Sequence, residues 1–175
     1  LGYPADIDSS FGFILGYDFS SEFQIRDNVD DNNINDLEGA ELTEDGILSS
    51  GGLRFPDQST DIQTDVSDLE NIQSYSFWVN TDSGWTHYAG NLNEPEVFIN
   101  GSSNSTFNNK YFDVQQNSNP DETILTLGSG PEGGFSGSID EFYLIDEEIN
   151  DENIYRYSLN YNGSLNGSHH YDFFR

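Results

Sequence analysis

The chain has 175 residues, a length that suits one domain, and its 32 acidic against 5 basic side chains give a formal net charge of -27. This charge excludes nucleic acids and anionic lipid surfaces as partners, because the chain has no basic cluster to bind their phosphates. Thirteen Phe, ten Tyr and two Trp residues supply enough apolar surface for a core, so the acidity does not indicate disorder.

Short segments rich in Phe, Tyr, Ile and Val follow one another along most of the chain. Gly, Asn, Asp and Ser separate these segments, and frequent turn signals of this kind predict antiparallel β-strands. The expected strands cover residues 11–19, 51–55, 60–66, 75–79, 84–89, 96–99, 110–114, 123–127 and 136–145.

Two connections between these strands have a distinct composition. Asp and Asn dominate residues 27–38, which we expect to form a polar loop after the first strand. Asn100-Gly101 follows an apolar segment directly and is a strong signal for a tight hairpin turn.

One segment near the C-terminus has helical character. Asn150 suits the N-cap position, and the acidic residues after it lie where the helix dipole favours negative charge. The apolar residues Ile149, Ile154 and Tyr157 fit one helix face. The sequence therefore predicts an all-β fold, an antiparallel β-sandwich, with one short C-terminal helix.

Several motifs in the expected strands carry a family resemblance. They are LGYDF at 15–19, GGLRF at 51–55, YSFWV at 75–79, WTHYAG at 85–90, EVFING at 96–101, LTLG at 125–128 and FSGSIDEFYLI at 135–145. In order and spacing this set resembles the laminin-G-like branch of the concanavalin A-like jelly-roll domains. The last motif is the most specific of the set.

The resemblance divides the chain into three parts. It implies a jelly-roll domain over residues 11–158, preceded by an N-terminal arm at 1–10 and followed by a C-terminal tail at 159–175. The tail has a Gly, Ser and Asn stretch and ends in aromatic residues. Such an end suits docking on the chain's own body or on a neighbour.

A calcium site is the main functional expectation that the resemblance brings. In this family the Asp of the G-x-I-D-E strand helps to hold calcium, and the matching residue is Asp140. Asp27, Asn28 and Asp30 of the acidic loop offer the oxygen ligands that calcium prefers. The alternative is that this loop is merely solvated, as acidic loops in such a chain often are.

Strand alternation gives a second reason to single out Asp140. It places Asp140 on one face with Phe142 and Leu144, among apolar neighbours, where a carboxylate requires a partner. The partner is either a bound cation or hydrogen-bond donors, and Arg54 is an alternative.

The sequence gives little support to catalysis. Jelly-roll glycoside hydrolases place two carboxylates on one strand face, whereas Ser138 stands at the nucleophile position and Asp140 and Glu141 are adjacent. His87 and the two Trp residues, Trp78 and Trp85, are expected to pack rather than to bind ligand. We therefore expect no enzyme activity.

Four N-x-[ST] sequons lie in Gly- and Ser-rich loops, at Asn100, Asn104, Asn162 and Asn166. The chain begins at a Leu and holds no Met or Cys, which fits removal of an export signal. We therefore expect an extracellular or cell-surface protein, its acidic surface solvated in concentrated salt as in halophiles.

Two functions fit these features. The first is a non-catalytic recognition and adhesion module that binds a glycan or a cell-surface protein, with structural Ca2+. The second is a structural subunit of a surface filament, coat or appendage, a homopolymer assembled through residues 1–15 or 161–175. Neither function inserts this chain into a membrane, because no apolar segment is long enough.

Overall fold

The computed structural model describes residues 13–20, 24–27, 29, 32–47, 51–66, 71–94, 96–105, 107–115 and 122–149. These residues form β-strands and contain no α-helix. The strands are β1 (Phe13–Tyr17), β2 (Glu41–Thr43), β3 (Gly52–Phe55), β4 (Ile62–Val66), β5 (Ser74–Asn80), β6 (Trp85–Asn91), β7 (Val97–Ile99), β8 (Ser102–Asn104), β9 (Phe112–Gln115), β10 (Thr123–Leu127), β11 (Ser129–Gly130), β12 (Gly133–Gly134) and β13 (Gly137–Ile145).

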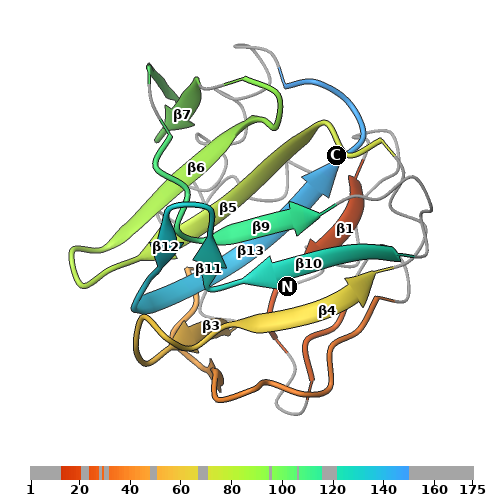
Figure 1. The fold of residues 1–175 in the computed structure, drawn as a ribbon. Helices are drawn as coiled ribbons and strands as arrows, with labels where there is room; N and C mark the ends of the chain where they lie inside the picture. The colour runs from red at the N-terminus through yellow and green to blue at the C-terminus, as the bar shows by residue number, and fades with distance from the viewer. Residues whose placement is uncertain are drawn as a thin grey trace.

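Two antiparallel sheets pack face to face (Figure 1). The larger has eight strands in the order β2-β3-β13-β5-β6-β7-β8, with β1 also paired to β13, and the smaller has three in the order β4-β10-β9. This confirms the predicted all-β sandwich of the jelly-roll class. The expected helix at 150–157, the arm at 1–10 and the tail at 159–175 lie outside the described residues. The described ranges hold no helix with the length and apolar character needed to span a bilayer.

Strand β13 lies in the interior of the larger sheet. It pairs with β5 along one edge, while β3 and β1 share its other edge. The last seven residues of β13 are buried, as expected for a strand that is covered on both sides. Residues 137–145 therefore run through the middle of one layer.

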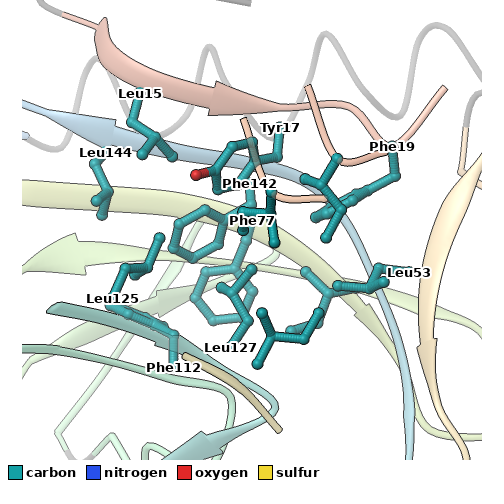
Figure 2. Close-up of a cluster of buried hydrophobic side chains, with 14 of the residues drawn as sticks. Leu15, Tyr17, Phe19, Leu53, Phe77, Phe112, Leu125, Leu127, Phe142 and Leu144 are labelled. Carbon is teal, nitrogen blue, oxygen red and sulfur yellow. The ribbon is translucent and has the colours of Figure 1, made fainter. Parts of the chain in front are cut away.

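The core fills the space between the two sheets, and aromatic rings dominate it (Figure 2). Phe77 of β5 and Phe142 of β13 face Phe112 of β9, with centroid separations of 5.4 Å and 5.3 Å to the Phe112 ring. Leu125 and Leu127 of β10 cover them from the smaller sheet. Each fully buried side chain of this size stabilises the fold by about 1.5–3 kcal/mol.

A β-bulge in β13 corrects the predicted alternation. The register against β5 shifts just after Asp140, which pairs with Trp78, and Glu141 has a φ of 48°. The extra residue reverses the side-chain alternation beyond it, so Phe142 and Leu144 join the core between the sheets. Asp140 therefore points to the opposite face, away from these two residues, contrary to the prediction.

Buried polar side chains occupy that opposite face. Tyr143 donates its hydroxyl to Glu141 Oε2 at 2.5 Å, and both residues are completely buried. Ser76 Oγ on the neighbouring strand β5 lies 2.8 Å from Nε2 of His87 on β6. The larger sheet is thus covered on both faces, with apolar rings on one and paired polar groups on the other.

Candidate functional site

Asp140 is completely buried, and both of its carboxylate oxygens accept backbone hydrogen bonds. Oδ2 accepts from the N–H of Ile47 at 2.8 Å, and Oδ1 accepts from the N–H of Glu141 at 2.7 Å. Because Ile47 belongs to the loop that follows β2, Asp140 holds this loop against the middle of the sheet. Burial raises the pKa of Asp140 well above its usual value, and the two N–H groups lower it only in part.

A second buried carboxylate lies near Asp140. Asp18 directly follows β1 and is 2% exposed, and its Oδ1 accepts hydrogen bonds from the N–H and Oγ of Ser20 at 3.2 Å and 2.9 Å. The charge of Asp18 raises the pKa of Asp140 further. The charge of Asp18 disfavours the ionised form of the buried Asp140 carboxyl, and a cation beside the two carboxylates would relieve this.

Arg54, the alternative partner that the sequence offers for Asp140, lies elsewhere. Its guanidinium is exposed on β3, with Nη1 3.2 Å from Oε2 of Glu41. The structure therefore corrects the suggestion that Arg54 neutralises Asp140. In the part of the chain that the structure describes, no Lys, Arg or His side chain forms an ion pair with Asp140 or Asp18.

The loop between β2 and β3 packs closely against Asp140 at Gly46 and against Phe19 at Gly51. A Cβ atom on Gly46 would lie 2.6 Å from Asp140 Oδ2 and 1.8 Å from the Gly51 carbonyl oxygen. A Cβ atom on Gly51 would lie 2.2 Å from the carbonyl oxygen of Phe19, the residue after Asp18. The Gly51 carbonyl oxygen thus lies near the Asp140 carboxylate, and the Phe19 carbonyl oxygen lies near Gly51. Glycine at position 46 permits the close approach.

This donor set fits calcium. Calcium takes six to eight hard oxygen ligands from carboxylates, carbonyls and water, at about 2.3–2.6 Å. Asp18 and Asp140 would supply the charge, and the carbonyls of Phe19 and Gly51 would add neutral donors. Within the described ranges no group of three or more His, Cys, Asp or Glu side chains is placed to hold a metal ion. The site would therefore depend on two carboxylates, carbonyls and water.

Asp27, the ligand predicted from the acidic loop, has both carboxylate oxygens engaged in hydrogen bonds. Oδ1 accepts from the N–H groups of Gly16 and Val29, both at 3.0 Å, and Oδ2 accepts from Asn32 N and Nδ2 at 3.4 Å and 3.3 Å. These bonds fasten the acidic loop to β1. The other two predicted ligands, Asn28 and Asp30, lie outside the described residues.

The two carbonyls and Asp18 were missed as candidate ligands, although one signal for Asp18 was present. It stands between Tyr17 and Phe19 in an apolar strand motif, the same setting that made Asp140 conspicuous. The carbonyl donors carry no sequence signal, because every residue has one. Their convergence depends on how the loops fold.

His87 and the two tryptophans have packing environments. His87 is completely buried, and its ring centroid lies 5.0 Å from that of Trp78. Burial lowers the pKa of His87 to about 3, which keeps the imidazole neutral. Trp78 is 1% exposed and Trp85 half-buried, as packing residues would be.

Two of the four sequons fall within the described residues. Asn100 and Gly101 form the turn between β7 and β8, with φ values of 51° and 83°, which confirms the predicted tight turn. Asn104 is exposed on β8, and its Nδ2 donates to the Ser102 carbonyl at 3.2 Å. Asn162 and Asn166 lie outside the described residues.

Comparison with known proteins gives matches only at the level of structure. The sequence matches no protein-family model and no curated protein. The structure is similar to the "Botulinum Neurotoxin Type G Receptor Binding Domain", with a TM-score of 0.56 and 11% identity over 85% of this chain and 51% of that chain. It is also similar to Trypanosoma rangeli sialidase, with a TM-score of 0.55 and 11% identity over 86% of this chain and 33% of that chain.

These similarities describe the fold. At such low identity they show the β-sandwich fold alone. The chain spans about half the length of the receptor-binding domain and a third of the length of the sialidase.

Proposed function

We propose that this chain is an extracellular, non-catalytic recognition domain of the laminin-G-like type, which binds a glycan or a protein and contains one structural calcium ion. The observation that carries the proposal is the buried Asp18–Asp140 pair with carbonyl oxygens around it. A calcium ion there would fix the end of β1 and the loops around Gly46 and Gly51. A rigid sandwich with ordered loops is a suitable surface for recognition.

Two further observations support a binding role. One structural neighbour is named for receptor binding, and the sialidase neighbour is found in complex with sialic acid. The carboxylates of the motif closest to a glycosidase pair, Asp140 and Glu141, are completely buried, which favours binding over hydrolysis.

The calcium part of this proposal is tested by thermal unfolding in ~1 M NaCl, where general screening of surface charge is already complete. Calcium at 100 times its Kd stabilises the folded chain by about 2.7 kcal/mol, or a Tm rise of about 5–10 °C for a domain of this size. Asp18→Asn should abolish the rise. Asp65→Asn is the matched control, because it removes one charge from an exposed position on β4.

The recognition part is tested by a glycan and cell-surface protein array probed with and without a calcium chelator. Calcium-dependent binding by the unaltered chain, weakened in Asp18→Asn, is the expected result. An absence of binding to every array member would contradict the proposal. Size measurement in high salt separates it from the filament-subunit alternative, whose assembly segments, 1–15 and 161–175, lie almost wholly outside the described residues.

A further inference from the structure

A second site opens at one end of the sandwich, where β5 begins and β6 ends. The cavity measures about 200 Å³. Tyr75 and the segment 91–94 border it from the larger sheet, and Phe107, Asn109 and Phe112 border it from the chain that enters the smaller sheet. Pockets for drug-sized ligands measure roughly 300–1,000 Å³, so this one suits a single ring.

The apolar wall of this cavity is aromatic and partly open. Tyr75 stacks on Phe107 with ring centroids 5.4 Å apart, and Phe112 meets Tyr75 edge-on at 5.1 Å. Leu92 at the rim is 37% exposed and is the one exposed large apolar side chain among the described residues. Phe107 and Leu92 thus offer an apolar surface on which the C–H face of a ring can lie.

Two polar groups that line the cavity have no hydrogen-bond partner among the described residues. In the described part of the chain no residue hydrogen-bonds the Tyr75 hydroxyl or the Glu94 carboxylate. The side-chain amides of Asn91 and Asn109, by contrast, already bond to protein groups. The Asn91 amide forms hydrogen bonds of 2.7 Å and 3.1 Å with the backbone of Ile149. Asn109 Nδ2 donates to the Phe112 carbonyl at 2.6 Å. The amides therefore hold the walls, and the hydroxyl and carboxylate remain for a ligand.

We infer that this cavity binds one uncharged sugar ring. The Glu94 carboxylate accepts hydrogen bonds from hydroxyl groups of the sugar. The Tyr75 hydroxyl forms a hydrogen bond with the ring oxygen or with a sugar hydroxyl. The apolar face of the sugar ring lies on Phe107 and Leu92. Acidic sugars are excluded by Glu94 and by the net charge of -27. This inference rests on the proposed recognition function and adds the ligand class and its place on the fold.

Saturation-transfer NMR on the full chain, with methyl glycosides of neutral hexoses, tests the site. The unaltered chain should bind at least one of them and bind N-acetylneuraminic acid at least tenfold more weakly. Glu94→Gln should weaken the neutral sugar about tenfold or more, and Tyr75→Phe about threefold to tenfold. Both substitutions spare the fold, since neither removed group bonds a described residue. Asp65→Asn, far from the cavity in sequence and on the edge strand β4, should bind like the unaltered chain.

Several outcomes would overturn the inference. Neutral sugars bound equally by the unaltered chain, Glu94→Gln and Tyr75→Phe would mean that recognition occurs elsewhere. Equal binding of N-acetylneuraminic acid, or tighter binding of tetramethylammonium, would show that the ligand class is wrong. If no neutral hexoside binds but the array shows calcium-dependent recognition, this inference fails and the proposed function stands. If neither the NMR nor the array detects binding, the proposed function fails too.

Discussion

At position 87 a histidine is kept neutral by its surroundings. His87 on β6 is completely buried, and its Nε2 hydrogen-bonds Ser76 Oγ of β5. Burial lowers its pKa to about 3, against about 6.5 in the unfolded chain. The folded state thus binds the proton less well than the unfolded state. The stabilisation from the neutral ring is complete above about pH 6.5 and is lost as the pH falls toward 3.

Replacement of His87 by Gln should remove this pH dependence. The amide keeps a partner for Ser76 but has no proton to gain, so the free energy of unfolding should fall less steeply below about pH 6.5. The unaltered chain should lose up to about 1.4 kcal/mol more per pH unit than His87→Gln. Urea unfolding of both chains from about pH 4 to about pH 7 measures the difference. Parallel curves would show that His87 does not titrate between the two states.

Of the individual residues, the sequence indicated Asp140 but not its neighbours. A carboxylate in an apolar strand is conspicuous, and this identified Asp140. The bulge at Glu141 was not predictable, because a single extra residue leaves the apolar pattern of the strand almost unchanged. The composition of the acidic loop made Asp27 a candidate ligand, and in the structure its carboxylate accepts hydrogen bonds from the backbone N–H groups of Gly16 and Val29.

Among the loops, the segment around Gly46 matters most for the candidate site. It connects β2 to β3, passes beside Asp140, and approaches the Gly51 carbonyl too closely for a side chain. Residues 44–47 are held by the bond from Ile47 to Asp140. The site therefore depends on the shape of this loop as much as on the carboxylates.

Gly46→Ala should disrupt the calcium site. The added methyl group would overlap the Gly51 carbonyl and crowd Asp140, so we expect a loss of about 1–3 kcal/mol or more in unfolding free energy and no Tm response to calcium. Gly52→Ala is the control, because the nearest atom to its new Cβ would lie 3.5 Å away, in ordinary contact. It should unfold within about 1 kcal/mol of the unaltered chain and keep the calcium response. Equal calcium responses in both variants would contradict this role of Gly46.

Strand prediction succeeded where apolar residues are frequent. The nine expected strands all occur, with ends shifted by a few residues, because each carries buried side chains. β2 and β8 were missed because both are only three residues long and lie at the edges of the larger sheet, where β2 is partly buried and β8 is exposed, so neither shows a hydrophobic pattern. The strands β11 and β12 consist of Ser and Gly residues, so no signal in the sequence indicated this short hairpin either.

The whole molecule combines a strongly negative surface with a negative interior site. Its net charge of -27 attracts cations from every direction, and the sandwich gathers two carboxylates where water is excluded. Loose attraction at the surface is screened by salt, whereas a buried site is screened much less. High salt therefore separates a specific cation site from the general acidity of the chain.

Calorimetric titration with calcium in ~1 M NaCl measures binding at the Asp18–Asp140 site alone, because attraction to the surface charges is screened there. We expect one saturable site with an affinity that rises with pH, because burial raises the pKa of Asp140 and calcium must displace its proton. The site should be absent in Asp18→Asn and intact in Asp65→Asn. No saturable binding by the unaltered chain, or equal binding by Asp18→Asn, would contradict the account.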